Sequence, residues 1–240
     1  MRFSYIEEIK NTTLSPAYPF QLQSQQCWLS SERCLFWENE KTLIISDLHF
    51  GKTGHFRKSG IAVPQDVYKE DLHRLMQQVQ YFQPERIIFT GDLFHSYENQ
   101  EHALFAKWRN AITANSIHLV KGNHDLLPNK VYDELGLVLH ENIFTTGPFV
   151  FVHDLNSLPE GSEKGYRISG HIHPGIRISG QGKQSLSFPC FYFSEKHAIL
   201  PAFSKFTGFV VIETLKTDTV FAIVKGNKNK GENSVLVKIQ

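Results

Sequence analysis

The sequence is poor in cysteine and lacks the spacings by which cysteines form a disulfide framework. Its 240 residues include three cysteines, Cys27, Cys34 and Cys190. An odd number without a CxxC pair indicates reduced thiols, because disulfide frameworks use paired cysteines in oxidising compartments. We therefore expect a cytoplasmic protein.

An excess of charge and a long hydrophobic run are also absent. Lys and Arg number 25 and Asp and Glu 24, for a formal net charge of +1. This balance excludes a protein that holds nucleic acid by bulk charge alone, but it leaves a local basic cleft open. The first ten residues contain acidic side chains and no apolar segment, unlike a signal peptide. The stretch from Ile143 to Val152 is far shorter than the roughly 20 residues that span a bilayer, so we expect a soluble protein without a membrane partner.

The rest of the composition is that of a globular protein with a large core. Hydrophobic residues make up 41% and aromatic residues 12%, so a mainly disordered chain is excluded. No low-complexity linker or internal repeat divides the sequence. We therefore expect a single domain over residues 1–240, with strands continuing to about residue 224.

Segments typical of strands and helices alternate in the first half of the chain. Apolar positions at helical spacing predict one helix that follows Pro64 and ends at Pro84, and a second from about Glu98 to Ala114. Short β-branched runs of strand length recur along the chain: Leu43–Ile45, Arg86–Phe89, Ile117–Val120, Leu137–Leu139, Phe149–Val152, Tyr166–Ile168, Phe209–Ile212 and Val220–Val224.

This order predicts an α/β fold built on two mixed sheets. The strand–helix–strand order of the first half is typical of a parallel sheet, and strands dominate from Leu137 onward. Partial alternation between Phe20 and Trp37 suggests an N-terminal hairpin. Residues Val211 to Val224 suggest another hairpin, which turns at Lys216–Asp218.

Histidine is unusually frequent, with 12 residues. It is the commonest metal ligand, but the number alone is ambiguous and the positions decide its meaning. Polar residues suited to metal binding follow five strand-like segments: Asp47-Leu-His49, Gly91-Asp92, Gly122-Asn123-His124-Asp125, His153 and Gly170-His171-Ile-His173. Sites in open α/β sheets form at the carboxyl ends of strands, so these five ends could converge on one point.

The spacing within the motifs supports a shared metal site. Asp47 and His49 are two residues apart, as are His171 and His173, so each pair shares one face of an extended segment. Three of the motifs begin with glycine, which permits sharp turns close to a buried ion. The mixture of Asp, Asn and His suits Mn²⁺, Fe or Zn²⁺ better than Ca²⁺.

Each motif alone has an ordinary structural explanation. Gly-Asp and Gly-Asn are common turns, and an HxH pair can be simple alternation on a half-exposed strand. A single histidine such as His153 is more often a core or surface residue than a ligand. Their joint occurrence, each after a strand, favours the metal site.

As a set, the motifs resemble the signature of the calcineurin-like metallophosphoesterases over about residues 43–175. The resemblance implies a four-layer α/β/β/α sandwich, with two mixed sheets flanked by helices and two divalent metals at the strand ends. It also implies the ligands: Asp47, His49 and His173 for one metal, Asn123, His153 and His171 for the other, and Asp92 as the bridge.

The resemblance further implies a hydrolytic mechanism. Metals about 3.5–4 Å apart lower the pKa of a bridging water, and the resulting hydroxide attacks phosphorus. His124 would face the substrate phosphate and protonate the leaving group, a contribution of about 10²–10⁴-fold. Manganese is the expected metal, with iron or zinc as alternatives.

A closer resemblance covers about residues 20–224 and is to one bacterial branch, the ligase-associated DNA damage response endonucleases. It is carried by these segments: Leu35-Phe-Trp37, Asp47-Leu-His-Phe-Gly-Lys52, Phe56-Arg57-x-x-Gly60, Gly91-Asp-Leu-Phe-His95-Ser96, Pro189-Cys-Phe-Tyr192, Leu200-Pro-Ala-Phe203 and Phe206-Thr-Gly208. The branch implies a nuclease in DNA repair, with DNA as substrate and a DNA ligase and a helicase as partners. Arg57 is a candidate for bidentate phosphate contact, and His95 for a place beside the metals. The alternative for Arg57 is a solvated loop.

Other functions stay open from the sequence. A phosphodiesterase or pyrophosphatase acting on a small nucleotide-type substrate would use the same metal signature. A non-catalytic scaffold would keep the fold, but it is disfavoured because all seven ligands and His124 are present. Protein Ser/Thr phosphatases carry Asp-Arg-Gly shortly after Gly-Asp, and this chain has Leu93–Tyr97 there instead. The apolar C-terminal hairpin makes a homodimer a further expectation.

Overall fold

The computed structural model describes residues 15–50, 67–94, 99–112, 114–157, 164–180, 184–226 and 233–240. Two β-sheets and three α-helices make up most of this part of the chain. None of the described helices is long and apolar enough to cross a membrane.

The first sheet has seven strands in sequence order. They are β1 (Tyr18–Leu22), β2 (Gln25–Ser30), β3 (Cys34–Trp37), β4 (Thr42–Ile45), β5 (Arg86–Thr90), β6 (Ser116–Val120) and β7 (Val138–His140). Short turns make β1 to β4 an antiparallel meander, with the 3-10 helix η1 (Glu38–Glu40) before β4. β4 to β7 are parallel, because α3 (Val67–Phe82), α4 (Asn99–Ala111) and α5 (Asn129–Glu134) lie in the connections between them.

The second sheet has nine strands and contains the C-terminal half of the described chain. Along the sheet, β14, β11, β12, β13, β10, β9 and β8 are neighbours, while β15 pairs with β12 and β16. The strands are β8 (Ile143–Thr146), β9 (Phe149–Val152), β10 (Tyr166–Ser169), β11 (Pro174–Ser179), β12 (Ser185–Phe193), β13 (His197–Ile199), β14 (Val210–Val211), β15 (Thr219–Val224) and β16 (Val235–Lys238). A 3-10 helix, η2 (Leu155–Ser157), follows β9.

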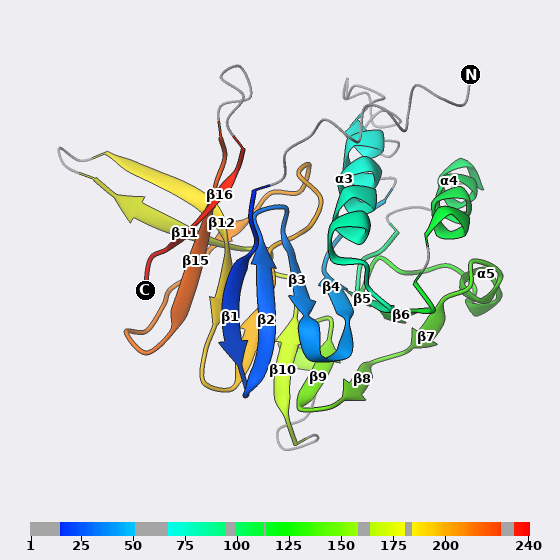
Figure 1. Cartoon of the computed structure of the whole chain (residues 1–240), viewed down its shortest axis with the longest axis horizontal. Helices are drawn as coiled ribbons and strands as arrows, with labels where there is room; N and C mark the ends of the chain where they lie inside the picture. The colour runs from blue at the N-terminus through cyan, green and yellow to red at the C-terminus, as the bar shows by residue number, and fades with distance from the viewer. Residues whose placement is uncertain are drawn as a thin grey trace.

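Alternating side chains give the first sheet two buried faces. One face packs on the helices, through residues such as Leu75 of α3 and Phe105 of α4. The other face packs on the second sheet, where Trp37 meets Phe149 with ring centroids 4.8 Å apart. Figure 1 shows α3, α4 and α5 to the right, beside β4 to β7, and β11, β12, β15 and β16 to the left. The predicted α/β fold with two mixed sheets is confirmed.

Most predicted elements are present, but the C-terminal hairpin is wrong. β14 pairs with β11, whereas β15 pairs with β12 and β16. The predicted turn does form, since the N–H of Asp218 donates to the carbonyl of Leu215. Oδ2 of Asp218 also accepts from the N–H of Leu215 at 2.7 Å and from the Tyr192 hydroxyl at 2.9 Å. These bonds attach the turn to β12, so β15 continues along β12 instead of returning to β14.

Candidate metal centre

Polar side chains from both sheets meet where parallel strands end. The register aligns Ile45 of β4 with Phe89 of β5, and Thr90 of β5 with Val120 of β6, so these strands end together. Five strand ends contribute side chains: Asp47 and His49 after β4, Asp92 after β5, Asn123 and His124 after β6, His153 after β9, and His171 and His173 after β10. The structure therefore brings together all eight residues that the motifs predicted for the metals and the proton donor.

Asp47, His49 and His173 form one compact group of potential ligands. Nε2 of His173 lies 3.3 Å from Oδ1 of Asp47 and 3.4 Å from Nε2 of His49. Metal–ligand bonds of about 2.0–2.2 Å place neighbouring ligand atoms roughly 3.0–3.5 Å apart. The three side chains therefore fit around a single divalent cation.

The Asp92 carboxylate lies between the two halves of the centre. Its Oδ2 is 3.7 Å from Nε2 of His49, and its Oδ1 is 3.5 Å from Nε2 of His153. Asp92 is only 2% exposed, so water does not compete strongly for these oxygens. Each oxygen faces a different histidine, which is the arrangement that a carboxylate needs to contact two ions.

His153 joins Asn123 and His171 on the far side of Asp92. Its Nε2 is 3.0 Å from Oδ1 of Asn123 and 3.1 Å from Nδ1 of His171. The other ring nitrogen of His153, Nδ1, lies 3.0 Å from the carbonyl oxygen of Thr90. Because a carbonyl only accepts, Nδ1 carries the proton and Nε2 presents a lone pair to the centre. These nitrogen and oxygen donors suit a second divalent cation.

Burial and neighbouring charges shift the pKa values of the two carboxylates. Burial opposes ionisation of Asp47, but the hydrogen bond from His173 and the charges of His173 and His153 outweigh it, so the pKa is lowered. The pKa of Asp92 is raised, chiefly by burial and also by the negative charge of Asp47. Two buried carboxylates repel each other, and a divalent cation removes that repulsion.

The backbone differs from the extended segments that the i, i+2 spacing predicted. Five of the converging residues have positive φ: Asp47 (51°), His49 (46°), Asp92 (49°), His171 (67°) and His173 (48°). The chain turns sharply at these positions, and the turns direct the side chains into the centre. Gly170 allows a close approach here, because a Cβ at this position would overlap Oγ of Ser46 and the Asp47 carboxylate.

Asp125 supports the centre, although the motifs gave it no role. Its Oδ1 accepts from the N–H groups of Leu93 and Phe94, both at 3.1 Å, and its Oδ2 accepts from Gly122 at 2.9 Å. The carboxylate therefore joins the loop that carries Asp92 to the loop after β6. Burial raises the pKa of Asp125 to about 7, although these hydrogen bonds favour the charged form. Its place directly after the Gly-Asn-His motif was the only sequence signal.

His124 lies beside the two metal-ligand groups and is partly buried. Its backbone N–H donates to Oδ1 of Asp92 at 2.9 Å. Its ring centroid is 5.3 Å from that of His49. His124 also belongs, with His49 and Asp92, to a group close enough to hold an ion. This position is compatible with either a proton donor or a ligand.

The two candidate substrate contacts, Arg57 and His95, lie outside the described residues. Their roles therefore stay predictions.

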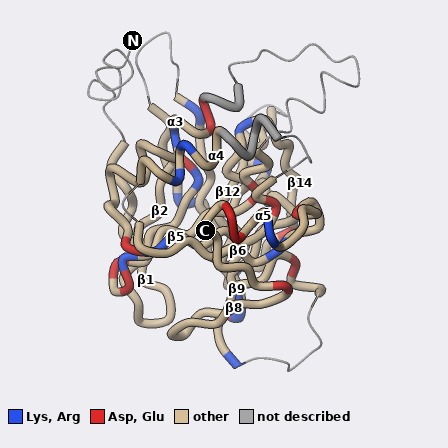
Figure 2. The backbone as a smooth tube through the Cα atoms, turned by 90° about the vertical axis from the view of Figure 1, so that its right-hand side faces the viewer, with Lys and Arg blue, Asp and Glu red and all other residues tan. Residues whose placement is uncertain are grey.

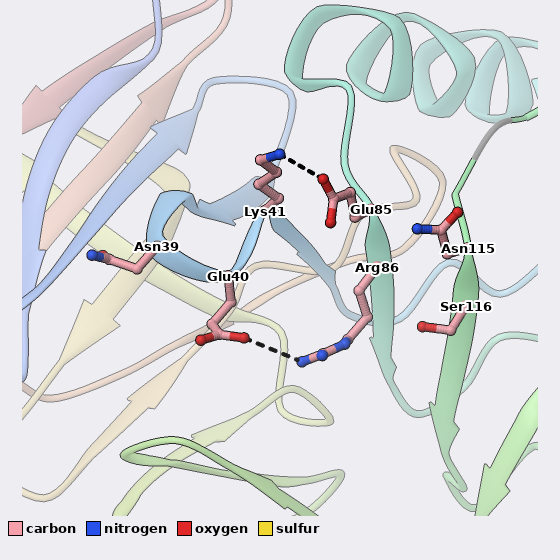
Figure 3. A pocket seen from close by; sticks show the side chains of 7 residues that line it. All are labelled: Asn39, Glu40, Lys41, Glu85, Arg86, Asn115 and Ser116. Carbon is pink, nitrogen blue, oxygen red and sulfur yellow. Dashed lines mark hydrogen bonds and ion pairs between the residues drawn. The ribbon is translucent and has the colours of Figure 1, made fainter.

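A second polar region lies at the opposite edge of the first sheet, where β5 and β6 begin. Its cavity of about 270 Å³ is lined by Asn39, Glu40, Lys41, Glu85, Arg86, Asn115 and Ser116 (Figure 3). Lys41 pairs with Glu85 at 2.5 Å and Arg86 with Glu40 at 4.0 Å. Each carboxylate of this region is paired with a basic side chain. The described residues here therefore do not offer the group of converging ligands that a metal centre needs.

Charge is dispersed over the rest of the described chain. Figure 2 shows basic and acidic residues interspersed along the backbone, without a broad area of one sign. Among the residues that the structure describes, a strong positive field at the metal centre would therefore come mainly from bound cations.

Comparison with known proteins identifies relatives of this arrangement. The family model of the calcineurin-like phosphoesterases matches residues 40–199, a range that includes every residue of the centre. The crystal structure of Pseudomonas putida nuclease MPE has a similar fold, with 24% sequence identity and a TM-score of 0.71. The similarity covers 86% of this chain and 96% of that one. No curated protein matches the sequence.

Proposed function

The chain belongs to the calcineurin-like phosphoesterase family and is a metal-dependent phosphoesterase, and we propose that it is a phosphodiesterase that cleaves nucleic acid. The observation that carries the proposal is the position of Asp92, with one carboxylate oxygen toward His49 and the other toward His153. A carboxylate in this position would contact two cations side by side, and such a pair stabilises both the attacking and the leaving oxygen of an in-line displacement at a phosphodiester.

We assign the ligands by their contacts. One cation would be held by Asp47, His49 and His173, the other by Asn123, His153 and His171, and Asp92 would contact both. When bound, two such ions polarise phosphate oxygens and lower the pKa of a water between them. Manganese is our first choice, because the mixed nitrogen and oxygen donors suit it, with iron and zinc as alternatives.

His124 acts as the general acid in this proposal. Its backbone N–H donates to the shared carboxylate, which supports the proposal because the ring would then lie within reach of a phosphate held at the centre. The deoxyribose alkoxide that leaves a cleaved DNA strand is a poor leaving group. Protonation of its oxygen by the His124 imidazolium removes that difficulty.

DNA is the substrate that we favour, and repair the process. The name of the structural neighbour, a nuclease, supports a nucleic-acid substrate. The near-zero net charge is compatible with it, because two divalent ions would supply positive charge at the point of cleavage. A DNA ligase and a helicase are the partners that we propose.

A substrate panel tests the proposal. The protein is loaded with Mn²⁺, Fe²⁺ or Zn²⁺ and assayed on single- and double-stranded DNA, RNA, cyclic nucleotides, a nucleotide sugar and bis-p-nitrophenyl phosphate. We expect the wild type to cleave DNA and an Asp92→Asn variant purified in parallel not to cleave it. Loss of cleavage in the variant excludes a contaminating nuclease as its source. Turnover of small substrates without DNA cleavage would replace the nuclease with a small-molecule phosphodiesterase.

A further inference from the structure

A separate cavity of about 400 Å³ lies at the same end of the sandwich as the metal centre. It opens between the β2–β3 turn of the first sheet and strands β12 and β15 of the second. β3 runs antiparallel to β4, with Leu35 opposite Ile44, so the β2–β3 turn lies at the edge where β4 ends and Asp47 follows.

A short chain of hydrogen bonds connects this cavity to the metal centre. Arg33 lines the cavity, and its Nη1 donates to the carbonyls of Ala202 at 3.1 Å and Ser204 at 2.9 Å. The backbone N–H of Ser204 in turn donates to the carbonyl of Asp47 at 3.2 Å. The backbone segment from Ala202 to Ser204 therefore contacts both the cavity wall and the first metal-binding loop.

The polar wall of the cavity carries more positive than negative charge. Its lining includes Arg33, Lys205 and Lys225 but a single carboxylate, Glu32. Glu32 is already engaged, by Nζ of Lys205 at 3.2 Å and by Nε of Arg74 at 2.7 Å. The lining therefore has an excess of cations that an anion would neutralise.

The residues behind the wall do not remove this excess. The buried Arg74 contacts both Glu32 and Asp71, and the charge of Glu70 also acts on Lys205. With Arg33 and Lys225, the cations still outnumber these three carboxylates by one. Burial and the nearby charge of Arg74 lower the pKa of Arg33 to about 10. The negative charge of an anion in the cavity would counter this shift and favour the charged guanidinium.

The remaining wall is apolar and suits a ring or a sugar. Phe188 and Pro189 of β12 and Ile223 of β15 line it. Cavities of about 300–1,000 Å³ with apolar walls and a few polar groups are typical of small-molecule sites. The size and the two kinds of wall together fit a nucleotide.

We propose that this cavity binds a nucleotide, with Arg33, Lys205 and Lys225 on the phosphate and Phe188 against the base or sugar. The bound nucleotide is either a free mononucleotide or one residue of the strand that is cleaved. Only the second source rests on the proposed nuclease function.

Binding is tested with Lys225→Gln and with the double variant Lys205→Gln/Lys225→Gln, both outside the metal centre. Lys238→Gln, an exposed lysine on β16, is the matched control. Manganese-loaded proteins are titrated calorimetrically with AMP and with inorganic phosphate. We expect the wild type and the control to bind one more AMP per chain than the double variant, with Lys225→Gln intermediate in affinity. Equal stoichiometry and affinity in all four proteins would overturn the proposal.

Kinetics then separate the two sources of the nucleotide. If the cleaved strand occupies the cavity, the double variant should raise KM for an oligonucleotide by about tenfold or more, as expected for loss of charged hydrogen bonds, and leave bis-p-nitrophenyl phosphate turnover unchanged. An unchanged KM with lost AMP binding identifies a free mononucleotide as the ligand. If the enzyme cleaves no nucleic acid at all, the proposed function fails, while the AMP titration still decides the cavity.

Discussion

The backbone N–H of His124 donates a 2.9 Å hydrogen bond to Oδ1 of Asp92. The same oxygen faces His153 at 3.5 Å. The loop that carries our proton donor is thus fixed to the carboxylate that we assign to both metals. A change at Asp92 should therefore disturb metal binding and proton donation together, whereas a change of the His124 ring should affect only the second.

Asp92→Asn should lose paired metal occupancy. The amide presents one oxygen instead of two, so it cannot contact two cations equally. We expect the bound metal to fall from two ions per chain toward one, measured by elemental analysis after gel filtration. Asp133→Asn, on the exposed face of α5, is the control and should keep two. Two fully occupied sites in Asp92→Asn would remove the bridging assignment.

His124→Asn should keep both metals and lose catalysis in proportion to the basicity of the leaving group. The loss of a general acid costs about 10²–10⁴-fold. p-Nitrophenolate leaves without much protonation, so the loss of kcat should be smaller on bis-p-nitrophenyl phosphate than on DNA. Equal losses on both substrates with reduced metal content would identify His124 as a ligand instead.

Gly170→Ala should destabilise the protein and weaken metal binding. Its Cβ would overlap Oγ of Ser46 and the Asp47 carboxylate, and both would have to move. Overpacking of this kind typically costs about 1–3 kcal/mol. Gly208→Ala is the control, since a Cβ there would meet nothing within 4 Å. Urea unfolding and Mn²⁺ titration of both variants check the prediction, and equal values for the two would contradict it.

Asp125→Asn should separate the two loops that this carboxylate joins. The amide nitrogen of asparagine cannot accept a hydrogen bond from the backbone N–H groups that donate to the oxygen it replaces. Leaving a buried donor unsatisfied costs about 1–3 kcal/mol. We expect a lower free energy of unfolding and weaker Mn²⁺ binding than in Asp133→Asn. Unchanged Mn²⁺ affinity would show that Asp125 supports the fold without positioning the centre.

His118→Phe should make the protein less sensitive to acid. His118 stacks on Phe144 with centroids 4.5 Å apart, and burial, followed by the charges of His140 and Arg86, lowers its pKa to about 4. A histidine in the unfolded chain has a pKa of about 6.5. As the pH falls, the unfolded chain therefore binds a proton at this position before the folded chain does. Stability is therefore lost as pH falls from about 6.5 to about 4, and phenylalanine removes this loss while it keeps the stack. Urea midpoints measured across this range should fall less in the variant than in the wild type, and parallel curves would contradict the prediction.

The sequence predicted the convergence of the strand-end side chains better than the strand pairing of the second sheet. Asp47, Asp92 and Asn123 follow short, apolar, parallel strands, and such strands bring their carboxyl ends together whatever the details of packing. The partner of β15 depended instead on contacts such as the part-buried hydrogen bond from the Tyr192 hydroxyl to Asp218, which joins residues far apart in the sequence. Composition and spacing do not record such contacts.

The supporting residues were hidden for the same reason. Local spacing could suggest the bond of Asp125 to Gly122, but not its bonds to the backbone N–H groups of Leu93 and Phe94 on another loop. The positive φ angles of Asp47 and His49 also could not be read from an i, i+2 pattern, because they arise where the chain must turn into the centre.

The left-handed backbone at five converging residues should make this enzyme more stable when its metals are bound. Each such residue costs of order 1–3 kcal/mol, so the metal-free centre holds conformational strain and close charges of like sign. Bound ions offset both, and at a free concentration of about 100 times Kd a ligand adds about 2.7 kcal/mol of stability. The amount of folded enzyme in a cell would then follow the supply of divalent metal. Depletion of the metal should therefore lower the stability of the protein as well as its activity.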